Sequence, residues 1–202
     1  MNMTSSERSR GRPREFDTDA ALDQAVLWFR EHGYSAASIA DLTAATGLSA
    51  GSLYKAFKDK HGLFRAALQR YTTVRNAELD RRVAGGVGAR NQLYKLLEYY
   101  AESAHDIEGR RGCLVVIATV ELASSDADIA ATVQQVLARN EQRLQELIAA
   151  AQQEGTLRSD IDAQASASMI LALLQGLRVL GKTGRSRAEV DAVLKTAMTL
   201  LS

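Results

Sequence analysis

The only proline of this 202-residue chain is Pro13, so nothing after it covalently interrupts a helix. Alanine, leucine, glutamine, glutamate and arginine are abundant, and these residues favour helices. Apolar residues make up 46% of the chain, which is enough for a packed core. We therefore expect an all-α fold after Pro13.

Apolar periodicity and capping residues predict about nine helices. Gly33 and Gly47 should end the first two, and a cluster of glycines at 85, 86 and 88 is the clearest break in composition. Residues 50–57 and a long stretch after Asp59 form the third and fourth helices. Later helices are expected over about 93–104, 114–123, 129–148, 163–181 and 187–201, with a basic turn between Gly109 and Gly112.

The segment from Ser38 to Phe64 predicts two short helices joined by a tight turn and followed at once by a third helix. Ser38 and Ser49 are suitable N-caps, and Gly47 can adopt the left-handed backbone of the turn. The residues spaced to pack these helices together are Leu42, Leu48, Leu53 and Phe57. This is the arrangement of a helix-turn-helix, which lays its second helix in the DNA major groove.

That second helix carries small residues at its start and a larger polar pair after them. The small ones, which let the helix start approach base edges, are Ser49, Ala50, Gly51 and Ser52. Tyr54 and Lys55 should point outward, and hydroxyls, helix amino termini and lysines are the usual phosphate partners. The alternative is that these positions only cap and pack the helix, which gives an exposed Tyr-Lys pair little purpose.

Bulk charge does not indicate nucleic acid, because 25 basic and 24 acidic residues leave a net charge of +1. The local exception is the tail ahead of the first helix, where Arg8, Arg10, Arg12 and Arg14 alternate. An extended arm of this kind can enter a minor groove or follow phosphates. We expect Arg12 and Arg14 to contact DNA; the alternative is a solvated tail.

From Gly33 to Phe64 the sequence GYSAASIADLTAATGLSAGSLYKAFKDKHGLF strongly resembles the TetR/AcrR family of bacterial transcriptional repressors. The resemblance implies a three-helix DNA-binding domain followed by a helical bundle that binds a small-molecule effector and dimerises. It also implies a homodimer on a palindromic double-stranded operator, released when the effector binds. We place the basic arm at residues 1–15, the DNA-binding domain at 16–62 and the ligand-binding and dimerisation domain at 63–202.

The resemblance also assigns contacts to individual positions. It implies that Ser38 caps the second helix close to a phosphate and that Lys55 reaches a base or a phosphate. Lys60, at the start of the fourth helix, would hold a phosphate. Contacts to the DNA backbone are implied for Ser49, Gly51, Ser52 and Tyr54.

Cys113 follows Arg110, Arg111 and Gly112 and opens an apolar helix. A helix start and two nearby cations favour the thiolate, which makes Cys113 a candidate sensor of electrophiles or oxidants. Some members of the family carry a Gly-Cys pair at a similar place and sense reactive compounds through it. The alternative is a small buried hydrophobe at a helix start.

A ligand pocket in such a bundle should be lined by the central helices. The candidates are Tyr94, Leu97, Tyr100, Cys113, Val116, Ile117, Val120, Glu121, Met169 and Leu173. Most of them are equally well explained as core residues. Glu121 is the exception, because a carboxylate in an apolar helix needs a structural partner, solvent or a ligand.

The last two predicted helices carry more apolar surface than one subunit needs to cover. We expect them to pair with the same helices of a second copy in a two-fold, four-helix interface. The residues assigned to it are Ile170, Leu174, Leu177, Val190, Val193, Leu194, Ala197 and Leu201. The alternative is that they only close the core of the monomer.

Other classes of protein find less support in the sequence. An enzyme is not indicated, because there is no nucleophile-base spacing and no phosphate loop; a helical adaptor would have no need of Tyr54, Lys55 and Lys60. The spacing of His105, Asp106, Glu108 and Cys113 matches no compact metal pattern, so neither metal nor cofactor is expected.

Compartment and membrane contact are indicated by what the sequence does not contain. A single cysteine allows no internal disulfide, and the Arg-rich start has no apolar signal region behind it. No uninterrupted apolar run reaches the roughly 18 residues of a spanning helix. We expect a cytoplasmic bacterial protein with no membrane partner.

Overall fold

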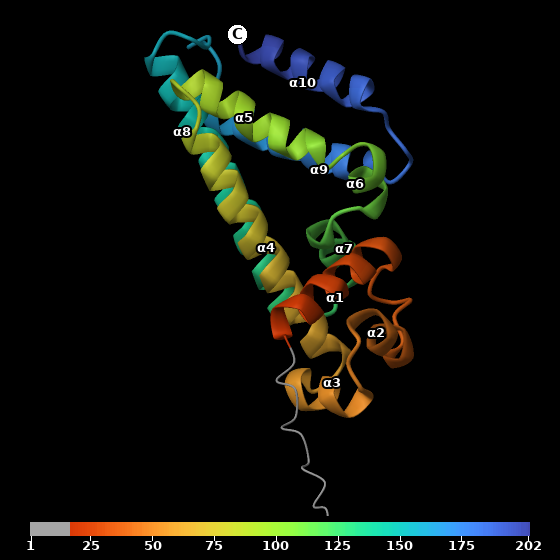
Figure 1. Cartoon of the computed structure of the whole chain (residues 1–202). Coiled ribbons are helices and arrows are strands. Elements are labelled where there is room, and N and C mark those ends of the chain that lie inside the picture. The colour runs from red at the N-terminus through yellow and green to blue at the C-terminus, as the bar shows by residue number, and fades with distance from the viewer. Residues whose placement is uncertain (1–16) are drawn as a thin grey trace, which may run out of the picture.

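A computed structural model of the chain describes residues 17–202, and every regular element in that range is a helix (Figure 1). The ten helices are α1 (Thr18–His32), α2 (Ile39–Thr46), α3 (Ala50–Phe57), α4 (Lys60–Ala84), α5 (Ala89–Glu102), α6 (Asp106–Arg111), α7 (Leu114–Glu121), α8 (Ala127–Gln153), α9 (Ala163–Gly181) and α10 (Arg187–Leu201). The all-α prediction is confirmed. The short α6 occupies the place where a basic turn was expected.

The predicted start and stop signals explain the first helices. Ser38 and Asp41 form a capping box at the start of α2, and Ser49 accepts a hydrogen bond from the Ser52 N–H at the start of α3. Gly47 ends α2 with φ 70°, in the left-handed region that favours glycine. These local bonds set the angle between α2 and α3.

Two hydrophobic cores hold the chain together. The first core joins α1, α2, α3 and the start of α4 to α7 and the first half of α8, with Phe29, Leu42, Leu53 and Phe64 fully buried at its centre. The second core contains the end of α4, α5, the second half of α8, α9 and α10. The 25-residue α4 crosses from one core to the other (Figure 1). Helices α1, α2 and α3 therefore share a core with α7 and α8.

The predicted dimer face was wrong, because almost all of its residues lie inside the subunit. The buried residues are Ile170, Leu174, Leu177, Val190, Leu194, Ala197 and Leu201, each no more than 5% exposed, and Val193 packs partly buried against them. Helices α9 and α10 are apolar on two faces, and apolar spacing alone does not tell which face turns inward.

The outward faces of the same two helices carry a second apolar set. On α9 Met169 is 46% exposed and Leu180 is 43% exposed, while on α10 Leu200 is 56% exposed. A groove of about 360 Å³ runs between the two helices there. It is lined by Met169, Leu173, Ala192, Val193, Thr196, Ala197 and Leu200.

Within residues 17–202, α9 is the one helix whose length and composition would suffice to cross a membrane, with a mean hydropathy of 1.3. Only 28% of that window is buried in the subunit. The two apolar faces account for this composition: one is in the second core, and the other lies on the outer groove.

Candidate nucleic-acid interface and effector site

The outer surface of α3 has the predicted form of a DNA-reading helix. Leu53 is fully buried on the inner side, while Ser49, Ala50, Gly51 and Lys55 are exposed on the outer side and Tyr54 is 48% exposed. Ser52 is half-buried next to the cap. The small side chains leave the amino end of α3 open, so its backbone N–H groups are accessible to a phosphate.

Two lysines lie between the end of α3 and the start of α4. Lys60 was predicted to hold a phosphate and is partly engaged inside the domain, whereas Lys58 was not predicted and is exposed. Lys60 donates from Nζ to the carbonyl oxygens of Tyr34 at 3.2 Å and Ala37 at 2.9 Å, and it lies 4.3 Å from the centre of the Tyr34 ring. Two of its three donors are thus engaged inside the domain, which leaves one for a phosphate. Lys58, which sequence reasoning passed over, is exposed at the C-cap of α3 with φ 70°. The three lysines at 55, 58 and 60 could have indicated it.

Arg12 and Arg14, predicted to contact DNA from the arm, lie outside the described residues. Ser38 is exposed at the start of α2, where its Oγ donates to Asp41 Oδ2. Its predicted cap role is confirmed, and the phosphate contact stays a prediction.

Helix α7 is tied directly to the loop between α1 and α2. Glu121, the last residue of α7, accepts hydrogen bonds from the backbone N–H groups of Tyr34 at 3.3 Å and Ser35 at 2.7 Å. Gly33 is needed in this loop, since a Cβ there would lie 2.4 Å from Glu121 Oε1 and its φ is 87°. Glu121 therefore has a structural partner, and the alternative of a ligand role is not supported.

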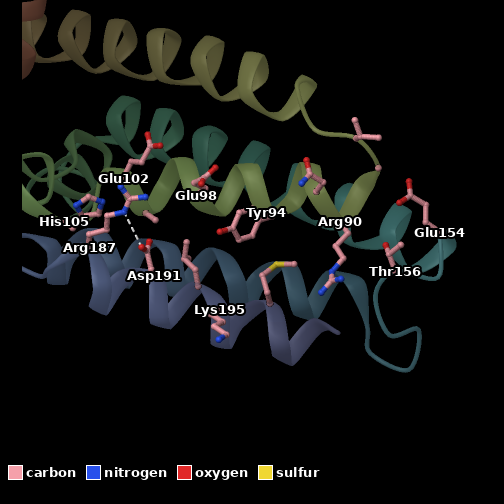
Figure 2. A pocket seen from close by; sticks show the side chains of 16 residues that line it. Arg90, Tyr94, Glu98, Glu102, His105, Glu154, Thr156, Arg187, Asp191 and Lys195 are labelled. Carbon is pink, nitrogen blue, oxygen red and sulfur yellow. Dashed lines mark hydrogen bonds and ion pairs between the residues drawn. The ribbon is translucent and has the colours of Figure 1, made fainter.

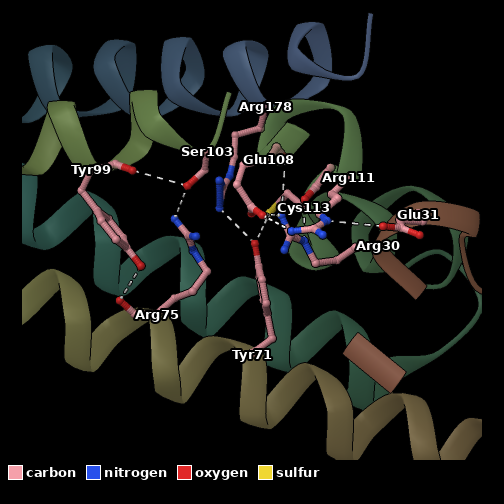
Figure 3. Close-up of polar contacts among 11 residues, drawn as sticks. Arg30, Glu31, Tyr71, Arg75, Tyr99, Ser103, Glu108, Arg111, Cys113 and Arg178 are labelled. Atoms are coloured by element: carbon pink, nitrogen blue, oxygen red, sulfur yellow. Dashed lines mark hydrogen bonds and ion pairs between the residues drawn. The ribbon is translucent and has the colours of Figure 1, made fainter. Parts of the chain in front are cut away.

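A second tie joins the end of α1 to α6. Arg30 is 6% exposed; its Nε donates to the Gly112 carbonyl at 2.8 Å, and its Nη2 donates to Glu108 at 2.8 Å. The other oxygen of that carboxylate accepts from Arg111 (Figure 3). Helix α1 and the loop after it are thus fixed to both ends of the segment that carries Cys113.

Cys113 lies in a buried polar cluster between α4, α5 and α9 (Figure 3). Tyr71 donates from its hydroxyl to Cys113 Sγ at 3.6 Å and accepts from Arg178 Nη2 at 3.1 Å. Arg178 also lies 5.4 Å from the centre of the Tyr100 ring. The cluster lines a small internal cavity of about 30 Å³. Of the predicted ligand residues, Tyr100 and Cys113 are at this cavity.

The cluster changes the acid-base chemistry of its thiol. Burial alone would raise the pKa of Cys113, but the Arg178 guanidinium, the Val116 N–H and Arg75 together lower that pKa to about 7. Burial raises the pKa of the Tyr71 hydroxyl, so that residue stays a neutral donor. The predicted cations beside Cys113 were Arg110 and Arg111; the cations that act on it are Arg178 of α9 and Arg75 of α4.

A larger cleft is also lined by Cys113 and Arg178. It has a volume of about 320 Å³, and its rim includes Val120 and Val179, which are 75% and 53% exposed. Five of the predicted ligand residues line it, namely Cys113 again, Val116, Ile117, Val120 and Glu121. We call this space the outer cleft and the 30 Å³ space the inner cavity.

The other predicted ligand residues lie elsewhere. Leu97 is fully buried in the second core, and Met169 and Leu173 line the outer groove of α9 and α10. Tyr94 lies in a groove of about 700 Å³ between α5 and α10 (Figure 2). That groove has both acidic and basic walls and touches none of α1, α2, α3 or α7. Among residues 17–202, no group of three or more His, Cys, Asp or Glu side chains is arranged to hold a metal ion.

Two protein-family descriptions match the chain. Residues 21–67 match "Bacterial regulatory proteins, tetR family". Residues 89–197 match "Tetracyclin repressor-like, C-terminal domain". The gap between the matches, residues 68–88, covers the rest of α4 and the loop that follows it.

Characterised relatives resemble the chain over most of its length. The transcriptional repressor ComR of Escherichia coli (strain K12) is 32% identical over 197 residues, covering 96% of this chain and 93% of ComR. DhaR of Mycobacterium sp. (strain GP1), also a transcriptional repressor, is 25% identical and covers 89% of each chain. A solved structure of a CifR cysteine mutant with 26-base-pair operator DNA has a TM-score of 0.81 and 31% identity, covering 93% of this chain and 98% of that one.

Proposed function

The chain belongs to the TetR family of bacterial regulatory proteins, and we propose that it binds a palindromic operator as a homodimer and leaves it when an effector occupies the second domain. As a member it is a transcriptional repressor that binds operator DNA, and it is not an enzyme. It is a soluble bacterial regulator, and we place its action in the cytoplasm.

The accessible start of α3 is the observation that best supports operator reading by this chain's own residues. A capped eight-residue helix presents Tyr54 and Lys55 outward and small residues at its amino end. Lys58 and the remaining donor of Lys60 extend the cationic surface. In this proposal residues 16–62 read DNA, residues 1–15 form the arm that brings Arg12 and Arg14 to it, and residues 63–202 bind the effector and dimerise.

A matched pair of double variants tests the DNA interface. Tyr54→Ala with Lys55→Ala should abolish binding to a DNA fragment that carries the operator. Each subunit then loses the Lys55 cation that contacts a phosphate and the Tyr54 hydroxyl that donates to the DNA backbone. Tyr94→Ala with Lys95→Ala removes another Tyr-Lys pair from α5 and should bind normally. In the Lys55→Ala single variant, the slope of log K against log salt should fall by about one per subunit. Normal operator binding by the first double variant would overturn the assignment of α3.

The outer face of α9 and α10 supports the homodimer. Met169, Leu173 and Leu180 follow one another at four- and seven-residue spacing along α9, which places them on one side of that helix. Gly176 lies in the same stripe, and a Cβ there would meet nothing within 4 Å. A second copy packed on this stripe and on Val193 and Leu200 would cover the apolar surface that the subunit leaves open.

We infer a second candidate mechanism of release from Cys113. A pKa of about 7 gives this thiol substantial thiolate character at neutral pH, and the outer cleft reaches it. The thiolate sulfur would attack an electrophilic carbon, form an S–C bond and displace the leaving group or open the strained ring there. If Cys113→Ser protein still left its operator on treatment with an alkylating agent, Cys113 would have no part in release.

A further inference from the structure

Arg178 is a buried cation without a carboxylate partner. It is 3% exposed, and among residues 17–202 only its Nη2 has an acceptor, the Tyr71 hydroxyl, while Nε and Nη1 are unpaired. The groups whose charge acts on it are Cys113, Tyr71 and Tyr100, and none is a carboxylate. Burying a guanidinium in this way costs several kcal/mol. Its two free donors are therefore available to an anion that enters the inner cavity.

The walls of the inner cavity reinforce this charge. Arg75 lines the same cavity from α4; it is half-buried, donates to Ser103 Oγ at 3.0 Å and lies 5.6 Å from the centre of the Tyr71 ring. No aspartate or glutamate lines the cavity within the described part of the chain. Two arginines without an acid make the inner cavity a site for negative charge.

The size of the spaces limits what can bind. The inner cavity, at about 30 Å³, has room for a head group of a few atoms. The outer cleft, at about 320 Å³, shares Cys113 and Arg178 with the inner cavity, and its walls include Val116, Ile117 and Val120. The charged inner cavity thus adjoins the apolar outer cleft, and Cys113 and Arg178 line both.

We propose that the effector is a small aliphatic carboxylic acid, with its carboxylate on Arg178 in the inner cavity and its hydrocarbon chain in the outer cleft. The inference rests on the proposed effector-controlled function and names the class of ligand. Binding is reversible and forms no covalent bond, so Cys113 takes no chemical part in it. A ligand there touches the N-cap of α7, and the other end of α7 holds the loop between α1 and α2.

The ligand class is tested on the full-length protein without DNA. Calorimetry and thermal shift would compare butyrate and hexanoate with butyramide, hexanamide and inorganic phosphate. Each amide should bind at least roughly tenfold more weakly than its acid, since a hydrogen-bonded charge is lost. Hexanoate should bind roughly tenfold more tightly than butyrate, because two more methylene groups are buried. Equal binding of acid and amide, or equal stabilisation by phosphate, would overturn the proposal.

Variants locate the site. Arg178→Met should lose hexanoate binding while the protein without ligand melts no lower than wild type, because an unpaired buried charge is replaced by an apolar side chain. Arg178→Lys should retain part of the affinity. Arg187→Met, in the groove between α5 and α10, removes an arginine elsewhere and should change nothing. Hexanoate binding that survives Arg178→Met would exclude the site.

Cys113→Ser separates this inference from thiol chemistry: the variant should still bind hexanoate, and at least as tightly as wild type at neutral pH, because the thiolate that competes for Arg178 is gone. Loss of binding in that variant would contradict the reversible carboxylate site. Binding is measured without DNA, so a protein that binds hexanoate but stays on its operator would contradict the proposed release mechanism and leave the ligand class standing.

Discussion

Cys113 and Arg178 are 65 positions apart in sequence, and each shifts the pKa of the other. The guanidinium favours the thiolate of Cys113, and negative charge on that sulfur in turn raises the pKa of Arg178. The Tyr71 hydroxyl lies between them, accepting from one and donating to the other. The acid-base state of this cluster is thus set by residues of three helices.

Removal of the guanidinium should raise the pKa of the thiol. In Arg178→Met the burial of Cys113 remains while its largest favourable charge is gone, so the pKa should rise from about 7 to above its usual value of 9.0. The ultraviolet absorbance of the thiolate, followed against pH in the folded protein, measures this directly. The Arg187→Met protein is the control and should titrate as wild type does. An unchanged midpoint in Arg178→Met would mean that Arg178 does not govern the thiol.

The same thiol should make stability depend on pH. Its folded pKa of about 7 lies below the value of 9.0 that applies to an exposed thiol, so ionisation favours the folded state. The stabilisation is fully present above pH 9.0 and is lost as the pH falls through 7. The free energy of unfolding of wild type minus that of Cys113→Ala should therefore increase between these values, by up to roughly 3 kcal/mol. Denaturant unfolding at several pH values tests it, and a difference that is flat with pH would contradict it.

At the scale of elements, α7 connects the proposed effector site to the DNA-binding helices. Its first turn follows Cys113, and its last residue, Glu121, holds two backbone N–H groups of the loop that precedes α2. A change at the inner cavity that shifts α7 would displace this loop. A displacement at the cavity can therefore reach α3 either through α7 and this loop or through the continuous α4.

Glu121→Gln should loosen that connection. The variant replaces two charge-assisted hydrogen bonds by weaker ones, which should cost roughly 1–2 kcal/mol locally. Hydrogen exchange should then become faster at the amides of Tyr34 and Ser35, and release from the operator should need more effector. Glu154→Gln is a matched control, because Glu154 accepts from the Ala89 N–H in the second core's region and is remote from α2. Unchanged exchange at Tyr34 and Ser35 would show that Glu121 does not hold the loop.

Local signals in the sequence predicted the elements well, and long-range packing explains the failures. The caps Ser38, Ser49 and Asp59 and the turn at Gly47 depend on neighbours within four residues, so the sequence is sufficient to place them. The partner of Glu121 lies 86 positions away and the cation beside Cys113 lies on another helix, so neither could be predicted from spacing. Spacing also does not show which face of a helix packs inside the subunit. The dimer residues were therefore assigned to the wrong face, because α9 and α10 each have two apolar faces.

At the scale of the whole molecule, the DNA-binding helices and the proposed dimer helices lie in different cores. The first core contains the DNA-binding helices together with α7, and the second contains α9 and α10, which lie far from α3 (Figure 1). The outer groove lies between α9 and α10. A dimer formed through that groove would hold two α3 helices at a separation set by α4. Successive major grooves on one side of DNA require about 34–36 Å between them.

Leu173→Glu should therefore produce a monomer. The new carboxylate lies in the outer groove and would be buried without a partner in the dimer, whereas in the monomer it faces water. Analytical ultracentrifugation should show half the mass of wild type, with helix content unchanged because Leu173 is outside the fully buried core. Operator affinity should fall steeply, since each subunit would bind one half-site alone. Val87→Glu places the same charge on a residue that is 91% exposed in the loop after α4, and this control should remain dimeric and bind normally. A Leu173→Glu protein that keeps the wild-type mass would move the dimer interface to another face of the molecule.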